Sequence, residues 1–416
     1  MNVDDFDMTD EELEPRPRSR SSRDDSGKSD ALRQVLESDP RIAMWLADPL
    51  APETGKALLR LQSLPDLTRM AVMPDVHPSA DVCVGCVLGT SELIFPQAIG
   101  GDIGCGMTTV RLKGVAASSL TPRDTAAILT QLGKRVDVMR RPSSRDPQGT
   151  DMPDPASLRA THLARLAERE GISQLGTLGR GNHFVELQRD DEDALWIMVH
   201  SGSRAMGQAI AGHYVRLAQR EGVRAALAGL KRGTPAGEDY LADQTWGVAY
   251  AKANRLNLLD SAAKALRDVC GGRTDWSTTI DLPHNLARIE RFEDAGELVV
   301  HRKGAAPASL NQPGLIPGSA GTISVHVEGR GDQRSMCSSS HGAGRLLSRS
   351  AARQSITSGD VRRQMGQVAF DRQREHSLRD EAPGVYRDLR VVMEAQRDLV
   401  KTTRTLRPLV SFKALG

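Results

Sequence analysis

The chain has few aromatic residues, little net charge and no long apolar run. Phe, Trp and Tyr make up 3% of its 416 residues, which argues against a protein that grips single-stranded nucleic acid by stacking bases on rows of aromatic rings. Because 55 Lys and Arg face 53 Asp and Glu, any contact with nucleic acid must depend on local basic patches. No stretch of about 20 apolar residues occurs, so we expect no membrane-spanning segment.

Cysteine is also scarce, with five residues in the chain and no signal-like apolar segment after Met1. An odd number of cysteines in a long chain is typical of a reducing compartment, and we expect a cytoplasmic protein. Cys83 and Cys86 form a CxxC pair, but no second pair exists to complete a tetrahedral zinc site. Since valines surround them, we interpret both as buried strand residues.

The composition predicts one large folded unit after a polar leader. Residues 1–30 are acidic, then rich in Ser, Arg and Asp, with little to bury, which predicts disorder. Hydrophobic residues make up 39% of the chain, enough for a substantial core. With no internal repeat and no linker, residues 31–416 are expected to form a single domain.

Local patterns predict several helices and strands, through alternation of apolar residues in strands and capping signals in helices. Thr121, Pro122 and Asp124 form such a start signal. The predicted helices cover residues 120–140, 155–170, 238–269 and 386–403, and the predicted strands cover 68–77, 82–88 and 195–199.

The stretch Ile99–Met107 holds four glycines around Asp102 and Cys105. Glycines let the backbone turn tightly while both side chains face one point. A hard carboxylate oxygen and a soft thiolate that can bridge two borderline cations suit manganese or zinc better than calcium. Taken alone, the stretch is slightly better explained as a turn around a buried structural cysteine.

Histidines in polar turns favour the metal interpretation. Five of the ten histidines lie beside Gly, Ser or Asn and not on helix faces, namely His183, His200, His284, His301 and His341. Several imidazoles with one carboxylate and one thiolate exceed the needs of one tetrahedral ion, so two ions sharing Cys105 are the more economical arrangement.

Glycine-rich turns with basic residues, at 176–181, 302–304 and 342–345, can hold phosphate through backbone N–H groups and cations. None matches a P-loop, and Gly176–Gly181 is a poor dinucleotide fingerprint. Two metal ions beside these phosphate-binding turns indicate phosphoryl or nucleotidyl transfer.

Seven motifs, in this order from about residue 67 to the C-terminus, resemble the RtcB family of GTP-dependent RNA ligases. The motifs are Met73–His77, Gly101–Met107, Gly181–Phe184, His200–Arg204, His301–Ala305, Ile316–Ser319 and Ser340–Arg345. The resemblance implies an α+β fold: one large catalytic domain with mixed sheets and a central cleft that contains metal.

The resemblance also implies an activity. Such an enzyme joins RNA ending in a 3′-phosphate or 2′,3′-cyclic phosphate to RNA with a 5′-hydroxyl, in tRNA splicing or RNA repair. It uses GTP and two Mn²⁺ ions, acts on broken tRNA or other RNA, and in some cases needs an archease-like activator. His341 would attack the α-phosphate of GTP to form a covalent histidine–GMP, which passes GMP to the RNA 3′-phosphate before the 5′-hydroxyl displaces it.

Position within the motifs assigns the site residues. The implied metal ligands are Asp102, Cys105, His183, His200 and His284, with Cys105 bridging. The implied nucleotide-binding residues are Asn182, Glu186, Ser319, Ser324, His341, Gly342, Ala343, Gly344, Tyr386, Lys413, Arg204 and Arg345. Of these, Glu186 suits the guanine edge, and the arginines, together with Arg349, suit phosphates of GTP or RNA.

Two loops depart from the family pattern. Pro78–Asp81 and Ala205–Met206 stand where glycines are usual, which stiffens both loops and leaves the implied ligands and nucleophile in place. Two other functions stay open: a two-metal phosphohydrolase acting on RNA ends or nucleotides, which needs the metals but not His341, and a non-catalytic RNA-binding repair factor, which needs neither.

Overall fold

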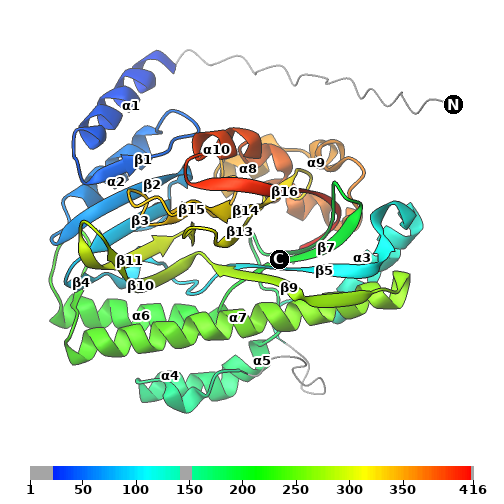
Figure 1. Ribbon diagram of the computed structural model, residues 1–416, viewed down its shortest axis with the longest axis horizontal. Helices are drawn as coiled ribbons and strands as arrows, with labels where there is room; N and C mark the ends of the chain where they lie inside the picture. The colour runs from blue at the N-terminus through cyan, green and yellow to red at the C-terminus, as the bar shows by residue number, and fades with distance from the viewer. Residues whose placement is uncertain (1–21, 141–151, 414–416) are drawn as a thin grey trace.

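Two large β-sheets organise the part of the chain that this computed structural model describes, residues 22–140 and 152–413 (Figure 1). Most of the predicted leader, residues 1–21, lies outside the described residues. The first described element is helix α1 (Ser22–Glu37), so helical structure begins before residue 31. Both sheets mix with helices in one unit, as the predicted α+β fold requires.

The larger sheet has seven antiparallel strands, in the order β13-β14-β16-β6-β7-β5-β9. These strands are β13 (Pro313–Ile316), β14 (Ser324–Gly329), β16 (Val400–Lys413), β6 (Phe184–Asp190), β7 (Ala194–Ser201), β5 (Gly106–Ala116) and β9 (Arg273–Pro283). Ends of the four neighbouring strands β6, β7, β5 and β9 lie side by side, because Phe184 pairs with His200 and Gly106 pairs with both Ser201 and Pro283. The residues that flank these strand ends are therefore brought together.

The smaller sheet has five strands in the order β1-β2-β3-β11-β10, of which only the β1–β2 pair is parallel. The strands are β1 (Ile42–Met44), β2 (Leu67–His77), β3 (Val84–Thr90), β11 (Gly296–Lys303) and β10 (Asn285–Phe292). His284 alone separates β9 of the first sheet from β10 of the second. The chain thus passes from one sheet to the other at the place where these strand ends of the larger sheet lie together.

Helices cover the sheets on opposite sides. Helices α6 (Arg204–Glu221) and α7 (Pro235–Cys270) lie along one side, and α8 (Arg349–Ser355), α9 (Ser358–Met365) and α10 (Leu389–Ala395) lie on the other (Figure 1). Apolar residues of α7 pack against the central strands β5, β6 and β7 to form a buried core. That packing holds α7 directly beneath the converging strand ends.

The remaining elements are short or peripheral. They are α2 (Pro52–Gln62), β4 (Leu93–Ile94), the 3₁₀ turns Pro96–Ala98, Ala117–Ser119 and Pro155–Ser157, α3 (Pro122–Arg135), α4 (Thr161–Leu166), a π-turn (Ala167–Gly171), α5 (Ile172–Gln174), β8 (Leu230–Lys231), β12 (Ala305–Pro307), β15 (Ser338–Ser340) and the 3₁₀ segments η5 (Arg372–Glu381) and η6 (Pro383–Val385). Strand β4 pairs with β8, and β12 pairs with β15.

Several local predictions are confirmed. The helix that begins after Thr121 has the expected capping box with Asp124, and the long predicted helix is α7, which ends at Gly271 with a φ of 74°. The predicted strands correspond to β2, β3 and β7. Cys83 and Cys86 are both fully buried, at 0% exposure, as predicted, but only Cys86 lies within β3, and Cys83 directly precedes that strand.

Two helix predictions are wrong. The predicted helix 386–403 is only α10, and the chain from Val400 onward forms strand β16 between β14 and β6. Pairing on both sides overrides the local pattern there. The predicted helix 155–170 is broken into a 3₁₀ turn, α4 and a π-turn.

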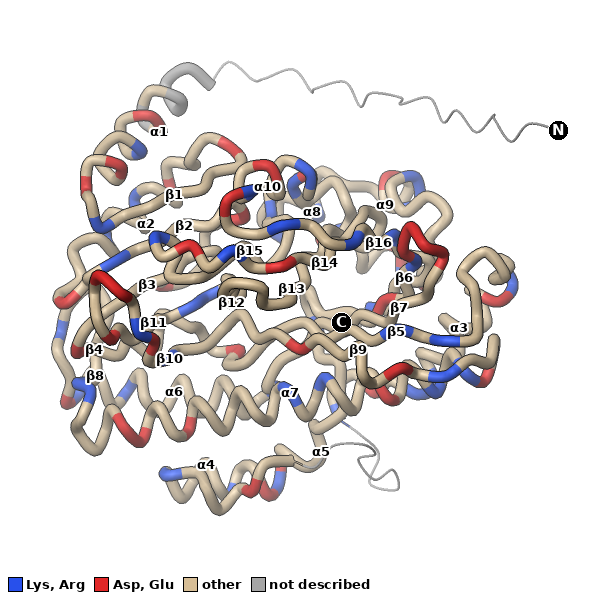
Figure 2. The backbone as a smooth tube through the Cα atoms, viewed as in Figure 1, with Lys and Arg blue, Asp and Glu red and all other residues tan. Residues whose placement is uncertain are grey.

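Lys and Arg are interspersed with Asp and Glu along the described part of the backbone (Figure 2), in keeping with the small net charge. Among the described residues, no helix combines the length and the apolar character needed to cross a bilayer.

Candidate active site

The loop between residues 99 and 106 holds Asp102 and Cys105 in a tight, fixed turn. Gly104 adopts a φ of 70°, and a Cβ there would lie 2.6 Å from the Val248 Cα of α7. Its N–H donates to the Asn285 carbonyl at 2.7 Å, and the Asn285 side chain donates to the Asp102 carbonyl at 3.1 Å. Glycine is therefore required at position 104, and the loop is pinned between α7 and the start of β10.

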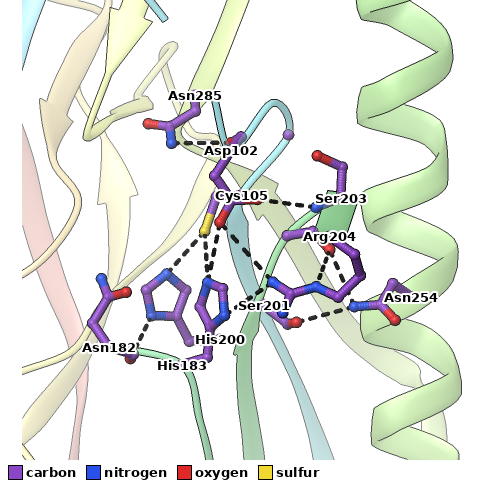
Figure 3. A network of polar contacts seen from close by, with 12 residues as sticks. Asp102, Cys105, Asn182, His183, His200, Ser201, Ser203, Arg204, Asn254 and Asn285 are labelled. Carbon is purple, nitrogen blue, oxygen red and sulfur yellow. Dashed lines mark hydrogen bonds and ion pairs between the residues drawn. The ribbon is translucent and has the colours of Figure 1, made fainter. Parts of the chain in front are cut away.

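The side chains of Asp102, Cys105, His183 and His200 converge on one point (Figure 3). The Cys105 Sγ lies 3.2 Å from His200 Nε2 and 3.4 Å from His183 Nε2. The His183 Nε2 also lies 3.2 Å from an Asp102 carboxylate oxygen. The four groups come from the ends of β5, β6 and β7, which explains how residues about a hundred positions apart meet.

Neighbouring groups orient these ligands. The His200 Nδ1 donates to the Asn182 carbonyl at 3.1 Å, which turns Nε2 towards the thiol. The Ser203 N–H donates to Asp102 Oδ1 at 3.1 Å. Arg204 donates to His183 Nδ1 at 2.9 Å, and its guanidinium also donates to the Leu178 and Gly202 carbonyls. In this structure His183 Nδ1 is therefore the acceptor and the ring proton lies on Nε2, which faces Asp102. Binding of a metal through Nε2 would require Arg204 to release Nδ1.

The electrostatics of the cluster suit a cation. Burial lowers the pKa of His200 and His284 well below the usual value, so both imidazoles are neutral. Burial, together with the nearby Asp102 carboxylate, raises the pKa of the Cys105 thiol well above its usual value. A divalent cation would reverse this effect by binding the thiolate directly.

The spacing also fits a metal. Sulfur and nitrogen ligands on one tetrahedral ion are separated by about 3.5 Å, given bonds of roughly 2.3 Å and 2.0 Å, close to the distances found here. Among the described residues, Cys105, His183 and His200 are the one group of three close enough to share an ion. Asp102 adjoins this group, and the His284 ring lies against His200 with a centroid separation of 5.2 Å. The five predicted ligands are thus gathered in one place.

His341 extends this row of imidazoles. Its ring centroid lies 4.7 Å from that of His284. The His341 Nδ1 donates to Asp75 Oδ2 at 2.6 Å, and the His341 backbone N–H donates to the same oxygen at 3.2 Å. Asp75 is fully buried. The carboxylate favours the tautomer of the neutral ring with the proton on Nδ1, in which Nε2 keeps the lone pair needed in a nucleophile.

Sequence reasoning assigned no role to Asp75. Asp75 lies near the end of the predicted strand 68–77, but its partner histidine is 266 positions away along the chain. Gly344, with a φ of 74°, lets the two segments approach, since a Cβ there would lie 2.5 Å from the Asp75 carbonyl oxygen.

His301 is not a turn histidine as predicted. It lies within β11, fully buried, where its Nε2 accepts from the Phe95 N–H at 3.0 Å and its Nδ1 donates to the Leu88 carbonyl at 3.2 Å. One ring nitrogen therefore contacts β3 and the other contacts the residue that follows β4.

A cavity of about 1150 Å³ opens beside His341 and the cluster. Its walls include Asp102, Cys105, His200, His284 and most of the predicted nucleotide-binding residues, namely Asn182, Glu186, Ser319, His341, Gly342, Ala343, Gly344, Arg345, Tyr386 and Lys413. Two predicted nucleotide-binding residues, and the predicted metal ligand His183, do not line it. Arg204 is turned to His183, and Ser324 is buried, with its hydroxyl 3.2 Å from Gln188 Nε2.

Glu186 is a buried acceptor in the cavity wall. Gln188 donates to one carboxylate oxygen at 2.8 Å and Ser411 donates to the other at 3.1 Å. Burial raises the pKa of Glu186 to about 7, although these donors and Lys413 oppose the shift. A ligand that brings two N–H donors would stabilise the ionised form.

Comparison with known proteins agrees with the motifs. A family model described as "tRNA-splicing ligase RtcB" matches residues 57–152 and 151–414. The "RNA-splicing ligase RtcB" of Escherichia coli (strain K12) is 32% identical over 404 residues, covering 89% of this chain and 97% of the relative. A protein of the same name from Mycobacterium tuberculosis is 28% identical over 432 residues, covering 86% and 99%. The "tRNA-splicing ligase RtcB" of Thermococcus kodakarensis is 30% identical over 294 residues, covering 59% and 61%.

Proposed function

The chain belongs to the RtcB family, and we infer from this membership that it is an RNA ligase. We propose that it joins RNA ending in a 3′-phosphate or 2′,3′-cyclic phosphate to RNA with a 5′-hydroxyl, in tRNA splicing or RNA repair, at the expense of GTP. The observation that carries the proposal is the hydrogen bond from His341 Nδ1 to buried Asp75, which leaves Nε2 free beside a cavity large enough for a nucleotide.

In the proposed reaction, the His341 Nε2 lone pair forms a bond to the α-phosphorus of GTP, and the bond from that phosphorus to the pyrophosphate oxygen breaks. Pyrophosphate leaves with the electron pair. Asp75 keeps the Nδ1 proton in place and offsets the positive charge that develops on the ring. The histidine–GMP then transfers GMP to the RNA 3′-phosphate, and the 5′-hydroxyl of the second RNA displaces it.

Two Mn²⁺ ions would be held by Asp102, Cys105, His183, His200 and His284. Once bound, they would neutralise charge on the reacting phosphates. The described residues fit this role through their converging N, O and S donors and their neutral imidazoles. The metal-binding thiol also requires a reducing compartment, and we propose the cytoplasm as the location.

The opposite part of the cavity would bind the nucleotide. The ionised Glu186 would accept from guanine N1–H and from its exocyclic amine, and Tyr386 and Lys413 line the same cavity. The remaining proposed contacts are Asn182, Ser319, Gly342, Ala343, Gly344 and Arg345. Ser324 would act through Gln188, and Arg204 through His183.

Covalent labelling tests the proposal. The purified protein is incubated with Mn²⁺ and GTP labelled at the α-phosphate, then denatured and separated. We expect a labelled protein band that is lost in His341→Ala and lost on mild acid treatment, because a phosphoramidate hydrolyses in acid. His162→Ala, which changes an exposed histidine on α4, is the matched control and should be labelled normally.

The outcomes separate the alternatives. Opening of a 2′,3′-cyclic phosphate that persists in His341→Ala, without labelling of any form, would favour a phosphohydrolase. RNA binding that is indifferent to all these substitutions would favour a non-catalytic repair factor. Adding an archease-like protein to a weakly labelled sample tests whether this chain needs an activator.

A further inference from the structure

Two adjacent carboxylates, Asp380 and Glu381, lie at the end of the 3₁₀ segment η5 behind one wall of the cavity. Both residues are about 4% exposed, although such side chains are seldom buried without partners. Neither was predicted as a site residue. Their partners are cations, and these cations line the cavity while Asp380 itself does not.

Glu381 contacts the inner part of this wall. One carboxylate oxygen accepts from Lys413 Nζ and from the Tyr386 hydroxyl, each at 2.7 Å. The other oxygen accepts from Arg349 at 2.7 Å and from Arg345 at 3.2 Å. Burial alone would raise the pKa of Glu381, but Lys413 and Arg349 outweigh it and lower that pKa. Glu381 is therefore an ionised hub with both oxygens occupied.

Asp380 contacts the outer part of the same wall. Its Oδ2 accepts from Arg353 at 2.9 Å and from Arg349 at 3.3 Å. The two sets of cations differ in exposure, because the side chains of Arg349 and Arg353 are 43% and 62% exposed while that of Lys413 is 7% exposed. The outer arginines therefore face solvent at the cavity mouth, whereas Lys413 lies inside.

The charges on this wall do not balance. Arg345, Arg349, Arg353 and Lys413 carry four positive charges, against two negative charges on Asp380 and Glu381. The acids hold the long side chains in fixed positions without cancelling their charge, and such preorganisation lowers the entropy lost when a ligand binds. The excess positive charge suits a polyanion.

We propose that Asp380 and Glu381 divide this wall between two ligands: Glu381 positions Lys413 and Tyr386 for the nucleotide, and Asp380 positions Arg349 and Arg353 for the phosphates of the RNA strand. The assignment rests on the proposed function, since the nucleotide and RNA are the ligands proposed there. Both acids are positioning residues. Arg349, which contacts both carboxylates, links the two halves.

Two isosteric substitutions test this division. In Glu381→Gln, we expect the KM for GTP in the labelling reaction to rise about tenfold, the effect of one lost charge-assisted hydrogen bond. The KM for RNA should change much less. In Asp380→Asn, we expect the KM for RNA to rise about tenfold and the KM for GTP to change much less. Glu375→Gln, on the same segment and paired with Arg362 at 3.1 Å, is the matched control.

A double variant shows whether Glu381 acts through Lys413. Lys413→Met alone should raise the KM for GTP, and adding Glu381→Gln should raise it little further, because the contact is already lost. Fully additive effects would contradict the positioning role. If Glu381→Gln does not fold, as judged by its melting temperature, Glu381→Asp keeps the charge but shortens its reach and supplies the same comparison.

Failure of the two proposals can be told apart. A wild-type protein that takes no label from GTP contradicts the proposed function. A wild-type protein that is labelled, with variants that change both KM values equally or change neither, overturns the division of the wall while leaving the ligase function intact.

Discussion

Asp75 and His341 are separated by 266 positions in the chain, yet the Asp75 Oδ2 accepts a hydrogen bond from His341 Nδ1 at 2.6 Å. The aspartate lies in β2 of the five-stranded sheet, and the histidine follows β15. The contact assigns the proton to Nδ1, and this in turn makes Nε2 the reactive nitrogen. A carboxylate behind a reactive imidazole commonly serves this purpose.

Asp75→Asn should therefore slow covalent labelling by about 100-fold or more, because an amide neither enforces the Nδ1–H tautomer nor stabilises the charged ring. Metal content should be unchanged, since Asp75 does not contact the cluster. Single-turnover labelling with GTP gives the rate. Asp81→Asn is the control, because Asn tolerates its φ of 59° and the side chain is exposed. Equal rates in wild type and Asp75→Asn would contradict the role of the pair.

Gly202→Ala should weaken metal binding although it replaces none of the proposed metal ligands. A Cβ at Gly202 would lie 2.2 Å from Asp102 Oδ1, so Asp102 must be displaced from the cluster. A change that disturbs the orientation of a metal ligand typically costs about 10- to 100-fold in affinity, measurable by titration calorimetry with Mn²⁺. In Gly133→Ala, the new methyl group would meet only the Phe412 ring, at 3.9 Å. That helix variant should bind Mn²⁺ normally, and a similar loss there would rule out the steric explanation.

Glu186 should make stability depend on pH. Burial raises its pKa from 4.5 to about 7 in the folded protein, so the folded state holds a proton that the unfolded state has lost. This contribution to stability is complete below the unfolded pKa and disappears as the pH rises through 7. Relative to Glu186→Gln, the wild type should lose on the order of 3 kcal/mol between about pH 5 and pH 8.

Urea unfolding at several pH values measures this difference. Glu192→Gln, in which the replaced side chain is exposed, should parallel the wild type at every pH. A constant gap between wild type and Glu186→Gln across the range would show that the raised pKa of Glu186 is wrong.

Arg255 should be essential to the folded structure. Its guanidinium is fully buried, forms two hydrogen bonds to Asp281 at 2.7 and 3.0 Å, and donates to the Gly104 carbonyl at 2.6 Å. Arg255→Met leaves the Asp281 carboxylate buried without its partner and should cost about 3–5 kcal/mol.

Chemical denaturation measures this cost, and a surface pair supplies the comparison. The ion pair between Arg232 and Glu297, at 2.6 Å, is partly exposed, so Arg232→Met should cost less than about 1 kcal/mol. Similar losses in the two variants would contradict the role assigned to burial.

Sequence reasoning identified the donors of the cluster because each lies in a recognisable local pattern. Glycines around Asp102 and Cys105, and polar turns beside the histidines, are properties of a few consecutive residues. The cap at Thr121 and the end of α7 at Gly271 are equally local. By contrast, the pattern over residues 386–403 was misread, since β16 is defined by its partners β14 and β6.

The sequence by itself therefore determined which residues could bind metal and phosphate, where the chain turns, and to which family it belongs. Only the tertiary structure decided that Asp75 holds His341, that Arg204 turns to His183 and away from the cavity, and that Asp380 and Glu381 hold the cations of one wall. The physical reason is the distance along the chain between the residues that interact. Propensity and periodicity report a residue's nearest neighbours along the chain, whereas these contacts depend on how distant strands and segments pack together.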